Sequence, residues 1–302
     1  MKDFGLIVVD KPVGPTSHQV VGMVRKGTGV RKVGHAGTLD PRASGVLVLC
    51  LGPATRLSEY LSGTTKEYEA VVRFGVSTRT FDGDGDVTHR SGRAPTRREI
   101  EQALPGFRGR IEQQPPPFSA IKVQGRKAYE LARAGEDPAL APRTVDILRL
   151  DLRAYQSPDL TLRVECSAGT YIRSLAHDLG QVLGTGAHLA GLRRTRAGPF
   201  TLEQATPWPM LEVGMMTDKW ERYVRPATDA LPELPQVLVG PEAVEALRYG
   251  HRIACGTPAT GSAKAVDPDG TLVALLVAAE DGSMWHPHKV FVGEPGESAG
   301  KG

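Results

Sequence analysis

The feature that most constrains this chain is a framed carboxylate in residues 35–49 (HAGTLDPRASGVLVL). Asp40 stands between Gly37 and Pro41, two residue types whose backbone preferences give loops a defined shape. An apolar run over residues 46–50 follows and predicts a buried strand. A surface aspartate needs no such frame, whereas a nucleophile or general base must be held in place closely. From these residues alone, the start of an Asp-Pro turn explains Asp40 equally well.

The charge distribution divides the 302-residue chain into two parts of opposite sign. Residues 1–235 hold 32 Lys and Arg against 26 Asp and Glu (+6), and residues 236–302 hold 5 against 8 (−3). A basic body permits a polyanionic partner such as nucleic acid, although solvated surface explains any single basic cluster equally well. The basic residues gather in three clusters: Arg25, Lys26, Arg31 and Lys32; Arg90, Arg93, Arg97 and Arg98; and Arg193, Arg194 and Arg196.

Cysteine usage and hydropathy indicate the compartment. The chain has three cysteines, and this odd, sparse count argues against a disulfide framework and for a reducing environment. No apolar run has the length of a membrane span, and the first residues lack a signal-peptide pattern. We therefore expect a cytoplasmic protein without membrane contact.

Apolar periodicity predicts an α+β fold. Short apolar stretches bounded by Gly and Pro predict strands. Residues 171–183 form the clearest helix, with Val182 on its apolar face, Thr170 as its N-cap and Gly184 at its end.

A Pro-rich stretch over residues 226–235 predicts a linker between two domains. We expect a catalytic domain over residues 1–230 and a small β-rich module over residues 236–293. Residues 294–302 are expected to form a frayed tail.

Metal and cofactor motifs are missing from the sequence. Residues 82–86 (DGDGD) imitate the start of a calcium loop, but Val87 and Arg93 stand where an EF-hand has Gly and Glu. No Cys and His spacing suits zinc, and no glycine-rich dinucleotide or phosphate loop occurs. We therefore expect catalysis by side chains alone, with neither a metal nor a nucleotide cofactor.

Six motifs then occur in a fixed order. They are residues 10–18 (DKPVGPTSH), residues 35–49 continuing into residues 52–56 (GPATR), residues 66–70 (KEYEA), residues 115–122 (PPPFSAIK), residues 166–180 (CSAGTYIRSLAHDLG), and residues 192–194 (LRR) with Gly198 and Phe200. In this order and spacing they closely resemble the TruB family of bacterial tRNA pseudouridine-55 synthases. The resemblance covers about residues 5–200.

This resemblance implies a fold and a reaction. The fold is a pseudouridine synthase domain with a mixed, mainly antiparallel central sheet flanked by helices and loops, followed by a PUA-like RNA-binding module. In the reaction, a uridine of the tRNA T loop is flipped out, cut at its glycosidic bond and rejoined through C5. The implied partner is the T arm of tRNA, and we expect a monomer.

The resemblance also implies three catalytic residues. Asp40 aligns with the family's catalytic aspartate: a carboxylate can add to a ring or sugar carbon and later leave, or it can take a ribose proton, and both routes stay open. Arg173 aligns with the arginine that pairs with this aspartate and favours its ionised form. Tyr68 aligns with the tyrosine that stacks on the target base, and its hydroxyl is a candidate to handle the C5 proton.

Four further residues are implied in substrate binding. Tyr171 and Leu192 align with residues of the uridine pocket. His35 aligns with a residue that enters the T loop where bases are displaced, and a ring there helps compensate for unstacking. Asp82 resembles a position near the flipped bases, although an Asp-Gly turn explains it equally well.

Two cations, Lys11 and Arg56, complete the expected substrate-binding set. Arg56 stands where the family commonly has lysine, which keeps the charge but changes its geometry. The acidic C-terminal part matches the PUA-like module only weakly. Two alternatives stay open: a pseudouridine synthase for another RNA such as rRNA, and a non-catalytic protein that binds or folds tRNA. The first and fourth motifs favour the tRNA T loop, and the intact catalytic residues disfavour a pure binder.

Overall fold

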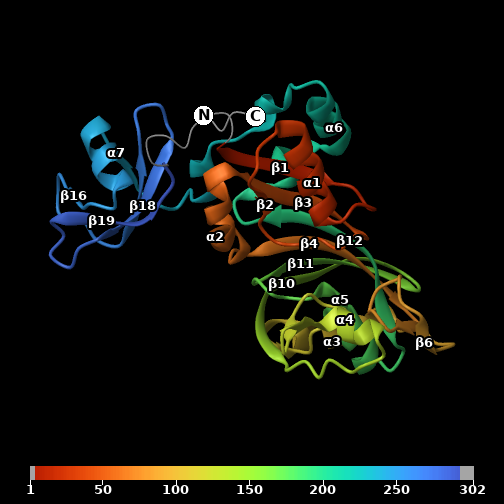
Figure 1. Ribbon diagram of the computed structural model, residues 1–302. Coiled ribbons are helices and arrows are strands. Elements are labelled where there is room, and N and C mark those ends of the chain that lie inside the picture. The colour runs from red at the N-terminus through yellow and green to blue at the C-terminus, as the bar shows by residue number, and fades with distance from the viewer. Residues whose placement is uncertain (1–3, 293–302) are drawn as a thin grey trace.

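The computed structural model describes residues 4–292, which form a large mixed sheet with its helices and a smaller β module (Figure 1). Within this range ten strands join the large sheet. Eight of them follow in the order β14 (Thr206–Pro207), β1 (Gly5–Lys11), β3 (Ala43–Leu51), β12 (Ala187–Ala197), β4 (Lys66–Phe74), β11 (Asp159–Cys166), β10 (Arg143–Gln156) and β7 (Gly109–Gln113). The other two are β2 (Val33–His35), which pairs with β3, and β13 (Phe200–Thr201), which pairs with β12.

Strand directions in the large sheet are mixed but mainly antiparallel. β1 and β14 run parallel, as do β3 and β12, whereas the other neighbours run antiparallel. In β4, buried positions alternate with more open ones, while β3 is buried along nearly all of its length. A strand covered on both faces reads as a continuous apolar run, which is why residues 46–50 looked buried. The predicted α+β class with this kind of sheet is confirmed.

Capping residues set the helix starts. Thr16 and Gln19 form a capping box at the start of α1, and Thr96 and Glu99 form the same box at α3. The α-helices of the described residues are α1 (Ser17–Thr28), α2 (Ser58–Ser62), α3 (Arg97–Ala103), α4 (Ala128–Arg133), α5 (Ile172–Val182), α6 (Trp208–Met216) and α7 (Pro241–Arg248). Short 3₁₀ turns are η1 (Gly52–Leu57), η2 (Leu104–Phe107), η3 (Leu202–Gln204), η4 (Trp220–Tyr223) and η5 (Ala227–Ala230).

Helix α5 departs from the expectation at both ends. Its N-cap residue is Tyr171, without a side-chain cap, and the Thr170 hydroxyl instead donates to the carbonyl of Ser167. Gly184 follows the end with a positive φ, as expected, but the Val182 side chain is exposed. Residues 172–176 are all buried, whereas Gln181 and Val182 in the last turn are exposed, although Val182 lies at helical spacing from buried Leu175 and Leu179.

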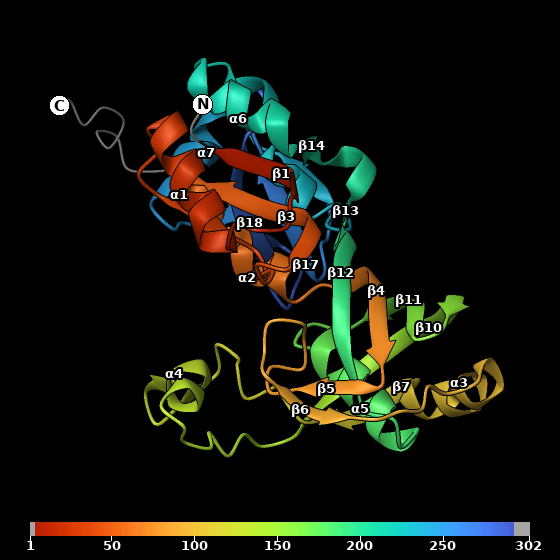
Figure 2. The same ribbon diagram turned by 90° about the vertical axis from the view of Figure 1, so that its right-hand side faces the viewer.

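Strands β4 and β12 connect two lobes of the large domain. Figure 2 shows them running from the lobe that carries β1, β3 and α1 to the lobe that carries β7, α3 and α5. Two small hairpins accompany the second lobe: β5 (Val76–Thr78) with β6 (Val87–Arg90), and β8 (Lys122–Val123) with β9 (Arg126–Lys127). This topology brings the loop before β3 and the start of α5 together beside β12.

The C-terminal module is a five-stranded sheet covered by α7. Its strands follow in the order β15 (Gln236–Leu238), β17 (Ser262–Val266), β18 (Leu272–Ala278), β19 (Met284–Val290) and β16 (Ile253–Ala254). The Pro-rich stretch over residues 226–235, which the sequence predicts to be a linker, carries η5 and is packed against the module. Ala227 and Ala230 are buried in a cluster that also contains Leu275 and Phe291 of the module. The two parts are therefore packed together through apolar side chains.

The expected frayed tail, residues 294–302, lies outside the described residues. Between residues 4 and 292, no helix is both long and apolar enough to cross a membrane.

Candidate active site

Asp40 lies in a tightly fixed loop between β2 and β3, residues 36–42, called here the Asp40 loop. Gly37 has φ +95°, a value that favours glycine. The Ser17 hydroxyl donates to the carbonyl of Leu39 at 3.0 Å and accepts from its N–H at 2.8 Å. The Pro41 carbonyl accepts from the N–H of Gly14 at 2.8 Å. The loop is thus held against the turn that precedes α1, and the first two sequence motifs meet here.

Arg173, in the first turn of α5, pairs with Asp40. Its Nε lies 3.0 Å from Oδ2 of Asp40. The arginine side chain is only 10% exposed, while that of Asp40 is 42% exposed. The guanidinium also donates to the carbonyls of Thr80 and Phe118, at 3.3 and 3.1 Å. An anchored cation therefore faces a carboxylate that a substrate can reach.

Asp82 is the second carboxylate at this guanidinium. Its Oδ2 lies 3.4 Å from Nη1 of Arg173. Its Oδ1 accepts from the Thr80 hydroxyl at 2.5 Å and from the N–H of Asp84 at 3.0 Å. The turn that explains Asp82 in the sequence does not exclude a role at the site, because this turn orients the carboxylate toward Arg173.

Gln113 positions the start of α5 and was missed from the sequence. Its side chain is buried, donates to the Tyr171 carbonyl at 3.0 Å and accepts from the Tyr171 N–H at 2.7 Å. Gln113 lies at the end of β7, far from α5 in the chain, so no local pattern could indicate it. It fixes the backbone of the N-cap residue Tyr171, although no side chain caps the helix.

The cleft beside Asp40 has a wall from β12. Leu192 lies on this wall, and Asp40, Asp82 and Arg173 line the same cleft. Leu192 is opposite Ala43 of β3 and Ala70 of β4, which fixes its place in the sheet. The structure thus brings four of the expected site residues around one hollow.

Two tyrosines from separate motifs accompany this site. Tyr171 is half-buried, with the Arg143 guanidinium 5.7 Å from its ring centre. Tyr68, on β4, is buried, and it lies opposite Arg194 of β12 in the sheet. Burial raises the pKa of Tyr68, while the Arg194 charge opposes this shift. The phenol is therefore neutral at physiological pH.

Three cations besides Arg173 are buried near the Asp40 loop: Lys11, Lys66 and Arg194. The Lys11 ammonium donates to the carbonyls of Pro12 and Pro15 at 2.8 and 2.9 Å. Burial lowers the pKa of Lys11 to about 8, although the nearby Asp40 carboxylate opposes this shift. Lys11 is fully buried, so the structure does not present it at a surface that RNA could reach.

Lys66 is the second buried lysine. It donates to the carbonyls of Ser62 and Thr64, at 2.5 and 2.6 Å. Burial, together with the charge of Arg194, lowers the pKa of Lys66 to about 8. Lys66 belongs to the third sequence motif, in which only Tyr68 is predicted to be a site residue.

His35 and Arg56 lie outside the cleft lining. His35 ends β2 and is half-buried, and burial, followed by the charges of Arg194 and His18, lowers its pKa. Arg56 is directed at the C-terminal module, where it donates to the Val290 carbonyl and lies 5.8 Å from the Phe291 ring centre. In this structure Arg56 therefore joins the two parts of the chain.

The arginine cluster on β12 differs from the exposed basic patch that the sequence allowed. Arg193 is paired with Asp10 at 2.8 Å, and Arg196 with Glu165 at 2.6 Å. Arg194 is 1% exposed. The residues of this cluster are thus largely committed to contacts within the protein.

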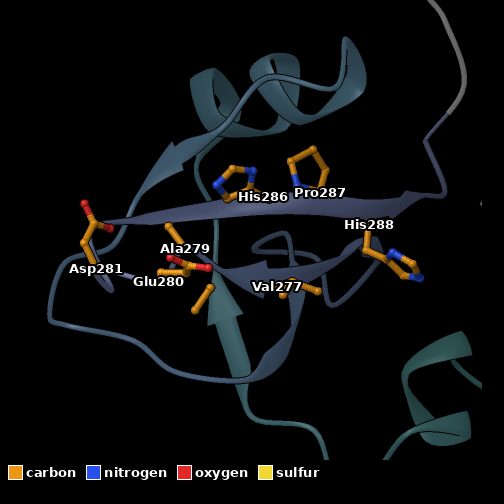
Figure 3. Close-up of a pocket in the computed structure, with 8 residues that line it drawn as sticks. Val277, Ala279, Glu280, Asp281, His286, Pro287 and His288 are labelled. Carbon is orange, nitrogen blue, oxygen red and sulfur yellow. The ribbon is translucent and has the colours of Figure 1, made fainter.

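The module has a hollow of its own, lined by residues of β18, β19 and the turn between them (Figure 3). Figure 3 shows His286 and His288 at separate places on β19, with Glu280 and Asp281 near the turn. No group of His, Cys, Asp or Glu among the described residues could hold a metal ion.

The mixed sheet and the Asp40–Arg173 pair agree with the class of protein that the sequence predicts, a pseudouridine synthase. Three family descriptions match consecutive parts of the chain. They are "TruB family pseudouridylate synthase (N terminal domain)" over residues 25–172, "tRNA pseudouridylate synthase B C-terminal domain" over residues 173–232, and "tRNA Pseudouridine synthase II, C terminal" over residues 234–292. The chain belongs to the TruB family.

Individual relatives agree with this assignment. The chain is 46% identical to the tRNA pseudouridine synthase B of Arthrobacter sp. (strain FB24), over 95% of this chain and 96% of that protein. It is 42% identical to the tRNA pseudouridine synthase B of Pseudomonas aeruginosa (strain UCBPP-PA14), over 93% of each. A solved H/ACA RNP bound to a substrate RNA containing 2'-deoxyuridine has a similar chain, with TM-score 0.72 and 30% identity over 96% of this chain and 86% of that one. The predicted family and fold are confirmed.

Proposed function

We propose that this protein converts uridine to pseudouridine at position 55, in the T loop of tRNA. The observation that carries the proposal is the accessible Asp40 carboxylate, 3.0 Å from the anchored Arg173 side chain, in a chain of the TruB family. Uridine and pseudouridine are isomers, so the overall reaction requires no co-reactant. Side chains that hold the base and move a proton are sufficient for this chemistry.

Asp40 is the proposed catalytic residue. Its position allows two first steps: its oxygen adds to a carbon of the uracil ring or the ribose, or it removes a ribose proton. Arg173 stabilises the ionised carboxylate in both, and it is fixed by two backbone carbonyls, so little reorganisation is needed during the reaction. After the glycosidic bond breaks, the detached uracil must rotate before C5 bonds to the sugar.

Tyr68 and Leu192 are proposed to hold the uracil as it rotates. A buried aromatic ring offers a stacking surface, and an apolar leucine allows rotation without hydrogen bonds that fix one orientation. Since burial raises the pKa of Tyr68, its neutral phenol is a weak base. We therefore assign stacking to Tyr68 first, and transfer of the C5 proton only together with a second proton acceptor.

The remaining substrate contacts are proposed from alignment and position. Tyr171 and Asp82 border the reaction centre, and His35 is proposed to enter the T loop where bases are displaced. The C-terminal part, residues 236–293, is proposed to contact RNA through local basic groups despite its net negative charge. Lys11 would require a change of conformation to contact RNA, because it is fully buried, whereas Arg56 is exposed but donates to the Val290 carbonyl of the module.

Action in the cytoplasm as a monomer is part of the proposal. The three cysteines are free in the structure, which suits a reducing compartment. The monomeric state stays a prediction.

A direct test uses an unmodified tRNA transcript and chemical mapping of pseudouridine. Wild type should modify the T-loop uridine, and Asp40→Ala should give no product above background. Asp86→Asn is the control, because it alters an exposed carboxylate in the same protein. Equal product from Asp40→Ala would refute Asp40 as the catalyst, and product in rRNA only would refute the tRNA substrate.

A further inference from the structure

Arg194 is a buried cation whose role the catalytic scheme leaves unexplained. It ranks among the largest side chains that are fully buried, at 1% exposure. No ion pair joins it to a carboxylate of the described residues. Burial of an unpaired charge is costly, and a buried arginine is retained only where its hydrogen bonds compensate. The positions of those hydrogen bonds indicate its function.

The guanidinium binds both ends of the segment that carries Asp40. Its Nη2 donates to the Gly37 carbonyl at 3.1 Å, and its Nη1 donates to the Thr38 carbonyl at 3.3 Å. Its Nε donates to the Val46 carbonyl at 2.7 Å. One planar group therefore spans the loop before Asp40 and the strand that follows it. A lysine ammonium concentrates its donors at one point and cannot reproduce this span.

The charge of Arg194 also acts on Tyr68, where it opposes the rise in the pKa of the phenol that burial causes. The backbone of Arg194 is fixed as well, because it lies opposite Tyr68 of β4 and Gly45 of β3. Gly45 has φ +102°, and a Cβ there would lie 2.2 Å from the Arg194 carbonyl oxygen. Strand β12 thus approaches β3 as closely as a glycine allows, which places the guanidinium beneath the loop.

We propose that Arg194 is a positioning residue that holds the Asp40 loop rigidly against the start of β3. This inference rests on the proposed role of Asp40, since it is the Asp40 carboxylate that Arg194 keeps in place. Without the guanidinium, three backbone carbonyls lose their donor and the loop can move away from Arg173. A displacement of about 1 Å at a reacting group can lower a rate on the order of 100-fold.

The first test measures the loop without RNA. Hydrogen–deuterium exchange is followed for peptides that contain residues 36–42 in wild type, Arg194→Gln and Arg196→Gln. Arg196→Gln is the matched control, because it removes an ion pair on the same strand but leaves the loop contacts intact. Exchange in the loop should be faster in Arg194→Gln only. Unchanged loop exchange in that variant would overturn the proposal, whether or not the protein is a tRNA-modifying enzyme.

The second test separates positioning from folding by single-turnover kinetics with excess enzyme and tRNA transcript. Arg194→Gln should lower the rate constant about 100-fold, with full product amplitude and tRNA affinity close to that of wild type. A lower amplitude with the wild-type rate constant would show loss of folded protein instead, and would overturn the proposal.

Arg194→Lys is the second variant, because it retains the charge and most of the volume. It should have a rate constant between those of wild type and Arg194→Gln, and it is the variant measured if Arg194→Gln does not fold. If Arg194→Lys has the wild-type rate constant, the three hydrogen bonds of the guanidinium are not required, and the proposal is overturned. If wild type itself gives no product, the proposed function fails, while hydrogen exchange still decides the role of Arg194.

Discussion

Around the Asp40 loop the protein buries Lys11, Lys66 and Arg194, whereas the contact between the large sheet and the C-terminal module buries apolar side chains. The buried cations donate to backbone carbonyls. At the module, Leu275 and Phe291 are buried, and the ion pair of Lys289 with Glu59 lies at the edge. The module contact includes one buried cation as well, since Lys264 of β17 donates to the Leu231 carbonyl at 2.9 Å. The two regions therefore differ in how many charged groups they bury, and the module contact is mainly apolar.

The difference follows from what each region must do. Apolar burial at the module contributes stability in proportion to area and tolerates small shifts. Charged groups next to Asp40 are expensive to bury, but each hydrogen bond fixes the backbone in one arrangement. The region around the Asp40 loop thus fixes the position of the reacting groups, whereas the module contact holds the two parts of the chain together. Variants in the two regions should therefore fail in different measurements.

Arg173→Lys should have the largest effect and should act on rate. Lysine cannot bridge Asp40, Asp82 and the two carbonyls at once, so the rate constant for pseudouridine formation should fall roughly 100- to 1000-fold. The free energy of unfolding should change much less than the rate. Arg163→Lys is the control, since it alters an arginine paired with Glu67 elsewhere in the sheet. Solvent-exposed ion pairs contribute little, on the order of threefold in an equilibrium constant. A rate constant for Arg173→Lys within about threefold of wild type would therefore contradict the claim that the region around Asp40 acts on rate.

Leu275→Ala should act on stability and leave the rate unchanged. Leu275 is 3% exposed in the cluster shared by the module and the large domain. Removing its side chain should lower the free energy of unfolding by about 3 kcal/mol. Val277→Ala, on the same strand but exposed, should cost less than about 1 kcal/mol. Denaturant titration measures both, and equal losses in the two variants would show that this contact does not hold the module.

The pH dependence of stability should show the smallest effect and should come from the lysines buried around the Asp40 loop. Lys11 and Lys66 have pKa values of about 8 in the folded protein against an ordinary lysine value of 10.5, so the unfolded chain binds more protons above pH 8. Stability should therefore rise as these lysines deprotonate. Burial raises the pKa of Cys50 to about 12 and that of Cys166 to about 11, which opposes the rise near pH 9.

Between pH 7.5 and 9 we expect a net gain on the order of 1–2 kcal/mol in the free energy of unfolding, measured in urea. Lys66→Met should reduce this slope, since it removes one of the two titrating lysines. A wild-type stability that falls across this interval would contradict the burial of the lysines as charged groups.

Local features of the Asp40 loop were predictable because they depend on residue type. The apolar run forms a buried strand, as predicted, and Gly37, expected to help shape the loop, does so with a positive φ. The contact between Ser17 and Leu39 was not predictable. It joins residues 22 positions apart through one hydroxyl, and no periodicity reports such a pairing.

The arginines of β12 show why the rest of the site stayed hidden. Arg193, Arg194 and Arg196 look alike in the sequence, yet only Arg194 is fully buried. Successive side chains of a strand point to opposite faces, and a register shift between Arg194 and Arg196 opposite β4 changes the alternation again. Which arginine lies beneath the loop depends on strand pairing, and pairing is a property of the whole sheet.

The close approach at Gly45 has a consequence for inheritance. Every single-nucleotide missense change in a glycine codon introduces a side chain, and each begins with a Cβ. At position 45 that atom would meet the backbone carbonyl of Arg194 at 2.2 Å. The gene therefore has no gradual route to a different residue here: codon 45 can drift among its synonyms, while any other step forces apart the two strands on which the catalytic loop depends.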